Sequence, residues 1–156
     1  MLNDAGSNKE YLPIAGDSEY VKLALKFAYE SDYLDEGGQG KYLAGVQRLS
    51  GTRACRIGGH FFSKSLKSNA DNDKKKKTAI YCPSPIWGNH IGIFQECGLE
   101  VQRYRYYDRS TNRLDFYGMM EDIRDAPAGS VVLLHVCAHN PTGCDPTLSQ
   151  WESYQI

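Results

Sequence analysis

The segment VVLLHVCAHNPTGCDP, residues 131–146, joins an apolar run to a set of polar side chains. The run at 131–136 predicts a strand that is buried on both faces, as in a parallel sheet. His139 and Asn140 follow the strand directly, and a Pro-Thr-Gly turn comes next. Because α/β proteins bind ligands at the carboxyl ends of parallel strands, we expect this segment to deliver polar groups to a binding site.

Short strands alternate with single helices upstream of this segment. Periodicity, caps and apolar runs predict helices at 17–30, 50–66, 89–97 and 116–124, and strands at 78–82, 99–107 and 131–136. Strands separated by single helices imply right-handed βαβ crossovers and a mostly parallel sheet, so the fold class is α/β. A further helix is expected after Asp145-Pro146, and the sequence ends inside it, so we expect a chain that continues past Ile156.

The overall composition is that of an ordinary soluble globular segment. Of 156 residues 41% are hydrophobic, and 18 basic residues against 19 acidic ones give a net charge of -1. This balance gives no sign of nucleic-acid or anionic-membrane binding. No apolar stretch approaches bilayer-spanning length, and residues 1–13 lack the apolar core of a secretory signal. We expect a cytoplasmic protein, with a mitochondrial location left open.

The cysteines and the lysine-rich stretch have simple interpretations. Five cysteines without a CxxC spacing fit neither a disulfide framework nor a zinc site, so free thiols are expected at Cys55, Cys82, Cys97, Cys137 and Cys144. The stretch NADNDKKKK, residues 69–77, is expected to be a solvated surface insert rather than a nucleic-acid site.

Ser50, Gly51 and Thr52 are expected to begin a helix. Free backbone N–H groups and the positive end of the helix dipole favour a phosphate there, and Gly51 lets the backbone approach closely. The alternative is that a hydroxyl residue at this position only caps the helix. Taken alone, the turn leaves both interpretations open.

Trp87, His90 and Asn140 follow two of the predicted strands. Trp87 is placed to lie flat on an aromatic ligand, or to serve as a core aromatic. His90 is placed to orient a ligand group, or to be a structural histidine. The Asn140 amide both donates and accepts, so it suits a phenolic oxygen, or it caps its own loop.

Six blocks in a fixed order give the sequence a family resemblance: KEYLPI (9–14), SGT…A-x-RIG (50–58), P-x-P-x-WGNH (83–90), YRYYD (104–108), DF-x-G…EDI (115–123) and LLH-x-CAHNPTG-x-DP…QW (133–151). Together they resemble the aspartate aminotransferases, a branch of the class I, fold-type I aminotransferases that use pyridoxal 5'-phosphate (PLP). The resemblance covers nearly the whole chain. It implies that residues 1–156 are part of the PLP-binding large domain, with helices on both faces of the sheet and the rest of that domain and the small domain absent.

The resemblance also implies roles for single residues. Ser50, Gly51 and Thr52 match the turn that binds the cofactor phosphate. Trp87 matches the tryptophan that stacks on the pyridine ring beside the substrate. Asn140 matches the asparagine that bonds the pyridine 3'-oxygen near the substrate carboxylate.

Four further residues match positions around the cofactor. His90 matches the histidine behind the aspartate that pairs with the pyridinium nitrogen. His135 and His139 match imidazoles one layer further out. Tyr11 matches the tyrosine that crosses a homodimer interface to the partner subunit's phosphate.

The implied reaction is reversible amino-group transfer between L-aspartate and 2-oxoglutarate, giving oxaloacetate and L-glutamate. The lysine that holds PLP, and the arginines that grip the substrate, lie in this family beyond the HNPTG block, so residues 1–156 alone are expected to be inactive and unstable. Lys64 lies in a superficially similar Ser-Lys-Ser context, but we expect it to be a surface residue.

Three points remain open at the level of sequence. Arg53 departs from the small glycine that usually follows the phosphate turn in the family, and it either adds a phosphate contact or crowds the turn. A short, non-catalytic binding protein derived from the same fold is one alternative function. An aromatic amino acid aminotransferase with the same core motifs is the other.

Overall fold

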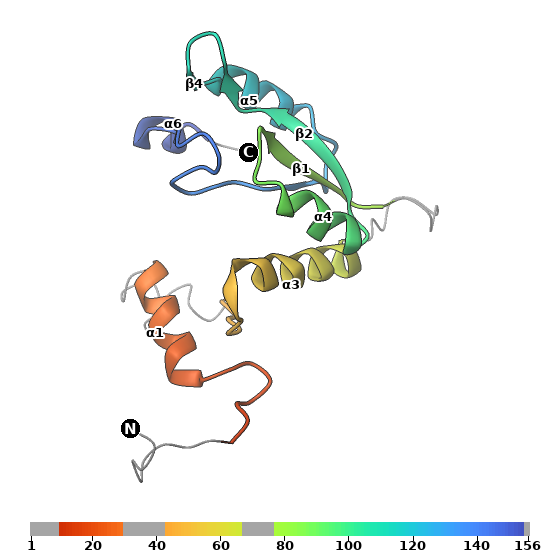
Figure 1. Cartoon of the computed structure of the whole chain (residues 1–156), viewed down its shortest axis with the longest axis vertical. Helices are drawn as coiled ribbons and strands as arrows, with labels where there is room; N and C mark the ends of the chain where they lie inside the picture. Colours follow the sequence, from red (N-terminus) through yellow and green to blue (C-terminus); the bar gives the residue numbers. More distant parts are fainter. Residues whose placement is uncertain (1–9, 30–42, 67–76, 155–156) are drawn as a thin grey trace. The chain divides into compact units, whose positions relative to one another are not determined.

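The computed structural model describes residues 10–29, 43–66 and 77–154 (Figure 1). The chain forms two compact units, Met1–Leu49 and Ser50–Ile156, which are considered separately. The first unit contains helix α1 (Ser18–Tyr29). The second contains, in order, α3 (Ser50–Ser65), β1 (Ala79–Ser84), α4 (Asn89–Glu96), β2 (Glu100–Arg105), β3 (Tyr107–Asp108), β4 (Arg113–Leu114), α5 (Phe116–Arg124), β5 (Val131–Val132) and α6 (Leu148–Glu152). Except for Lys77, the insert expected at 69–77 lies outside the described residues.

The predicted start of α1 is confirmed by its cap. The Tyr20 N–H donates to Asp17 Oδ1 at 2.8 Å, which makes Asp17 the N-cap. The Asp17 N–H in turn donates to Gln47 Oε1 at 2.8 Å, so the helix start is tied to a segment 30 residues further on.

The second unit is organised around a parallel sheet in the order β2-β1-β5. β1 pairs with β2 along its whole length, from Ala79↔Glu100 to Ser84↔Arg105. On its other side, β1 pairs with β5 through Ile80↔Val131 and Tyr81↔Val132. The predicted α/β class and the mostly parallel sheet are therefore confirmed.

Helices cover both faces of this sheet, as the family resemblance implied (Figure 1). Alternation along β1 sends Ile80 and Cys82 to one face and Tyr81 to the other. The α4-side cluster contains the buried residues Ile80, Cys82, Ile93, Phe94, Cys97 and Leu99. The α5-side cluster contains Tyr104, Tyr106, Met119, Met120 and Ile123.

Helix α3 packs against α4 through a glycine. Gly59 is the buried residue of α3, and an added Cβ there would lie 2.8 Å from Cys97 Sγ and 3.2 Å from Phe94 Cδ1. Backbones approach this closely only where a side chain is missing. Half-buried Cys55 and Phe62 extend the same face of α3 onto the α4-side cluster.

Helices α5 and α6 begin at side-chain caps. The Asp115 carboxylate accepts the Gly118 N–H at 2.9 Å, and α5 has the predicted bounds. Thr147 and Gln150 form a reciprocal capping box at the start of α6, which confirms the helix expected after Pro146.

The predicted strand at 131–136 is wrong in length and in burial. β5 covers only Val131–Val132, residues 131–135 are half-buried, and Val136 is 81% exposed. The Leu133 N–H still donates to Tyr81 O at 2.9 Å, and then the chain leaves the sheet. β5 lies at the edge of the described sheet, so no strand among the described residues covers its outer side.

A short hairpin was also missed, because 99–107 reads as one continuous strand. β2 ends at Arg105, and β3 pairs with β4 in antiparallel register. The turn between them is closed by Asp108, which accepts the Ser110 N–H at 2.8 Å. Asn112 adopts a left-handed φ of 54°, which asparagine tolerates better than most residues.

The Tyr104 hydroxyl ties β2 to the chain after β5, donating to Leu133 O at 2.9 Å from a side chain that is 1% exposed. Tyr104→Phe removes the hydroxyl group and leaves the Leu133 carbonyl oxygen without this hydrogen bond. We expect the free energy of unfolding to fall by about 1–2 kcal/mol, measured by denaturant unfolding of the full-length protein. The matched control is Tyr107→Phe, whose hydroxyl bonds Asn112 Oδ1 at an exposed site. Equal losses for the two variants would contradict the role given to Tyr104.

Candidate functional site

Two chain segments leave the sheet at the same edge, because β1 and β5 are parallel. The loop after β1 carries Trp87, and the segment after β5 carries His135, His139 and Asn140. His90 is the second residue of α4. Ring contacts bring Trp87, His90, His135 and His139 together at this edge.

A continuous series of rings runs across this edge. The Trp87 ring meets the His90 ring edge to face at 5.0 Å between centroids. The His90 ring lies 5.4 Å from that of His135, which lies 4.7 Å from that of His139. The His139 ring stacks on Tyr106 at 3.9 Å, with 23° between the planes. The series links the loop after β1, helix α4, the segment after β5 and Tyr106, which directly follows β2.

Hydrogen bonds hold two of these imidazoles and assign the tautomer of one, His135. Thr142 Oγ1 accepts the Cys144 N–H at 3.2 Å and also forms a hydrogen bond with His139 Nδ1 at 2.8 Å. His135 Nδ1 accepts the Asn140 N–H at 3.3 Å. The neutral His135 ring therefore carries its proton on Nε2.

Three ring nitrogens of this series are buried without a hydrogen-bond partner among the described residues: His90 Nδ1, His135 Nε2 and His139 Nε2. Buried polar atoms are normally satisfied, so each of them indicates a partner from outside the described chain. His90 is 8% exposed, and its ring contacts that of the half-buried Trp87.

Burial keeps all three imidazoles neutral. Burial lowers the pKa of His139 to about 4, helped by the neighbouring His135 and opposed by the Asp145 carboxylate. Burial is also the main cause of the lowered pKa of His90, with His135 as the second cause. The pKa of His135 is lowered by burial and raised in part by Asp145. At neutral pH the series can donate and accept hydrogen bonds without adding charge.

Asn140 presents its side chain to solvent, and its amide bonds no described residue. The Ser84–Pro85 and Asn140–Pro141 peptide bonds are both cis. Because its side chain is exposed and bonds no described residue, the Asn140 amide is available to a ligand at the edge of the sheet where Trp87 and His90 lie.

The Ser50-Gly51-Thr52 turn forms the first three residues of α3, and all three are exposed. An added Cβ at Gly51 would meet no atom within 4 Å, so the space above this helix start is open. Exposed N–H groups at the positive end of a 16-residue helix suit an anion. Whether the turn binds one remains a prediction.

Three other residues singled out from the sequence lie at the surface. Tyr11 is fully exposed and belongs to the first unit, so its position relative to the ring series is not defined. Lys64 is exposed near the end of α3, which confirms the surface interpretation. Arg53 is exposed in the first turn of α3.

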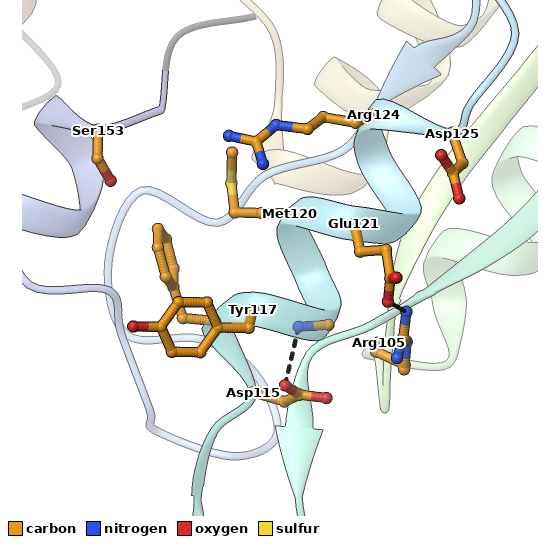
Figure 2. Close-up of a pocket in the computed structure, with 10 residues that line it drawn as sticks. Arg105, Asp115, Tyr117, Met120, Glu121, Arg124, Asp125 and Ser153 are labelled. Carbon is orange, nitrogen blue, oxygen red and sulfur yellow. Dashed lines mark hydrogen bonds and ion pairs between the residues drawn. The ribbon is translucent and has the colours of Figure 1, made fainter.

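An open groove of about 870 Å³ lies elsewhere, along α5 (Figure 2). Figure 2 shows Arg124 and Met120 on the side of α5 that faces Ser153. Arg105 closes another part of the groove through its ion pair with Glu121 at 2.5 Å. None of the residues expected to bind the cofactor lines this groove, so it is distinct from the candidate site.

Residues that sequence reasoning did not assign to the site help to build it. Tyr106 supplies the ring under His139, and its hydroxyl donates to Cys144 O at 2.7 Å. Asp145 accepts the backbone N–H groups of Ala138 and His139. Both residues lie inside the YRYYD and CAHNPTG-x-DP blocks, so the signal was present, but no local rule gave them a role.

The described part of the chain shows no disulfide, no metal site and no membrane-spanning helix. All five cysteines are unpaired, as expected. Within residues 10–29, 43–66 and 77–154, no group of three or more His, Cys, Asp or Glu side chains is placed to hold a metal ion. No described helix combines the length and the apolar character needed to cross a bilayer.

Comparison with known proteins gives one consistent result. A family model described as aminotransferase class I and II matches residues 2–154. "Aspartate aminotransferase 1" of Medicago sativa is 47% identical over 152 residues, covering 97% of this chain and 34% of the relative. Similar relatives include proteins named as cytoplasmic and as mitochondrial aspartate aminotransferases.

Solved structures agree with the sequence relatives. The cytoplasmic aspartate aminotransferase of Saccharomyces cerevisiae superposes with a TM-score of 0.79 at 40% identity, covering 96% of this chain and 34% of that one. An aromatic amino acid aminotransferase from Burkholderia cenocepacia gives a TM-score of 0.81 at 32% identity, covering 95% and 34%. The chain spans about a third of the length of the relatives that it matches.

Proposed function

The chain belongs to the aminotransferase class I and II family, and on that premise we propose that it forms part of an aspartate aminotransferase. The complete protein would move an amino group between L-aspartate and 2-oxoglutarate. The observation that carries this proposal is the 47% identity, over 97% of the chain, to a protein named aspartate aminotransferase.

PLP fits the residues that are present. The cofactor combines a phosphate, an aromatic ring and a phenolic oxygen. The exposed start of α3 offers N–H groups and two hydroxyls to the phosphate, half-buried Trp87 offers a ring face, and the exposed amide of Asn140 suits the oxygen. The unpartnered His90 Nδ1 fits a carboxylate supplied by another part of the protein.

Bound PLP supplies an electron sink for negative charge that develops at the amino acid Cα. The residues of this chain would hold and orient it. Ser50 and Thr52 would fix the phosphate, Trp87 would exclude water from one ring face, and Asn140 would donate to the 3'-oxygen. No side chain in residues 1–156 is assigned as the base that moves the proton.

A homodimer is part of the proposal. Tyr11 would reach the phosphate site of a partner subunit, which agrees with a side chain that is 100% exposed in its own chain. The compartment is proposed as the cytoplasm, although relatives with mitochondrial names are about equally similar.

An aromatic amino acid aminotransferase is the second candidate. It is favoured by the TM-score of 0.81 to the Burkholderia cenocepacia enzyme, and disfavoured by the lower identity of 32%. The distinction depends on substrate preference, so it is measured directly by comparing aspartate with phenylalanine as the amino donor.

The test uses the native polypeptide, captured from its own cells with an antibody to residues 69–77. We expect an intact mass well above that of 156 residues, bound PLP, and transfer from aspartate to 2-oxoglutarate. A native mass equal to that of the 156-residue chain would overturn the proposal in favour of a non-catalytic binding protein. Faster transfer from phenylalanine than from aspartate would support the aromatic alternative.

Trp87 gives a separate prediction for the full-length protein. If its ring stacks on PLP, binding should quench its fluorescence, and Trp87→Phe should weaken PLP binding by about fivefold because some stacking remains. Trp151 in α6 is half-buried and packs against Tyr154, so Trp151→Phe is the matched control. Quenching that survives in Trp87→Phe and disappears in Trp151→Phe would contradict the role of Trp87.

A further inference from the structure

The loop that carries Asn140 is folded around a carboxylate of its own chain. Asp145 Oδ2 accepts the Ala138 N–H at 2.6 Å, and Oδ1 accepts the His139 N–H at 2.8 Å. Ala138 has a φ of 52°, a left-handed conformation that is unfavourable for alanine. Successive N–H groups around a left-handed residue form a concavity that binds anions. Here the anion is the Asp145 side chain.

Other contacts fix the remainder of this loop. The Gly143 N–H donates to His139 O at 2.7 Å and closes the turn. The His139 ring is held between Thr142 Oγ1, at 2.8 Å, and the Tyr106 ring. His139 itself is 1% exposed, so it anchors the loop in the interior.

Asn140 is the exception in this well-held loop. Its backbone N–H bonds His135 Nδ1, while its side-chain amide is exposed and bonds no described residue. The backbone on either side therefore sets the direction of the Asn140 Cα–Cβ bond, from which the amide extends. On the side that precedes Asn140, the Asp145 carboxylate holds the backbone by accepting the N–H groups of Ala138 and His139.

We propose that Asp145 is a positioning residue for Asn140, and that it acts through the two backbone N–H groups of Ala138 and His139. This inference rests on the proposed function, in which Asn140 donates to the 3'-oxygen of PLP. Without the carboxylate, the left-handed Ala138 loses its stabilising anion and two N–H groups lose their acceptor. The loop then relaxes, and the Cα–Cβ bond that carries the Asn140 amide no longer has one fixed direction.

The test compares two ligands of the full-length protein without its cofactor: PLP and 3-deoxypyridoxal 5'-phosphate, which lacks the oxygen that Asn140 would bond. Wild type should bind PLP about tenfold more tightly, since one hydrogen bond is worth about that factor. Asp145→Ala should remove this preference and leave the affinity for the 3-deoxy analogue unchanged. Asp145→Asn keeps one acceptor oxygen and should retain part of the preference.

A double-mutant cycle shows whether Asp145 acts through Asn140. Asn140→Ala should also remove the preference, and adding Asp145→Ala to it should change PLP affinity no further. Hydrogen exchange of the ligand-free protein gives an independent readout. The amides of Ala138 and His139 should be protected in wild type and exchange at least tenfold faster in Asp145→Ala.

Asp108→Ala is the matched control. Asp108 also holds a turn through its carboxylate, which accepts the Ser110 N–H at 2.8 Å, but it lies in the β3–β4 hairpin. This variant should keep the wild-type preference for PLP.

Each remaining outcome overturns a defined statement. Equal weakening of both ligands by Asp145→Ala, or additive effects with Asn140→Ala, would overturn the positioning role. A wild type that binds both ligands equally would overturn it too, while leaving cofactor binding intact. A wild type that binds neither ligand would overturn the proposed function together with the inference.

Discussion

Gly59→Val is expected to lower the free energy of unfolding by about 3 kcal/mol, through overpacking between α3 and α4. The first added carbon alone would lie 2.8 Å from Cys97 Sγ and 3.2 Å from Phe94 Cδ1. Both neighbours are buried, Phe94 at 4% and Cys97 at 5% exposure, so neither side chain has space to move aside. Chemical denaturation of the full-length protein measures the loss.

The neighbouring glycine gives the control for this prediction. An added Cβ at Gly58 would meet no atom within 4 Å, although Gly58 lies in the same helix. Gly58→Ala should therefore be neutral or stabilise the protein by up to about 1 kcal/mol, because alanine is a better helix former than glycine. If Gly59→Val were no more harmful than Gly58→Ala, the close approach of α3 and α4 would be refuted.

Acidification from pH 7 to pH 4 is expected to remove about 3 kcal/mol of stability through His139 alone. Its pKa is about 4 in the folded protein and about 6.5 when unfolded. Because folding depresses this pKa, the stabilisation is complete above about pH 6.5 and is lost progressively toward pH 4, as the unfolded chain takes up the proton first. The pKa values of His90 and His135 are lowered too, so they add to the loss.

His139→Gln isolates this contribution. The variant removes the titrating group, so its denaturation free energy should fall less steeply than that of wild type between pH 6.5 and pH 4. The same substitution at the exposed His60 of α3 is the matched control for replacing a histidine. Parallel curves for wild type and His139→Gln would show that His139 is not held neutral by burial.

Local signals predicted the helices well, because their ends are set by residues close in sequence. Asp17 is the N-cap that the sequence predicts, and Asp115 and Thr147, which were not predicted as caps, also bond the first turns of their helices. The parallel pairing of β1 with β2 and β5 followed from the alternation of strands and helices.

The errors concern features that depend on distant neighbours. An apolar run predicts a strand, but its length and burial depend on which strands lie beside it, and β5 has only β1 among the described residues. The break after β2 depends on the turn held by Asp108, which interrupts an otherwise regular strand pattern.

The candidate site shows the same division. Residue types and the family resemblance pointed to Trp87, His90 and Asn140, and the structure brings Trp87 and His90 into ring contact. The tautomer of His135 could not be predicted, because it is set in three dimensions by the Asn140 backbone N–H. The contact of Tyr11 with the phosphate site of a partner subunit stays a prediction.

The position of β1 at the centre of the sheet has a consequence for cooperativity. Ile80 and Cys82 are built into the α4-side cluster, and Tyr81 contacts the α5-side cluster. If either cluster unfolded alone, β1 would lose the packing on one of its two faces. The two layers should therefore unfold in a single transition, and the amides of β1 should exchange only when the whole of this unit opens.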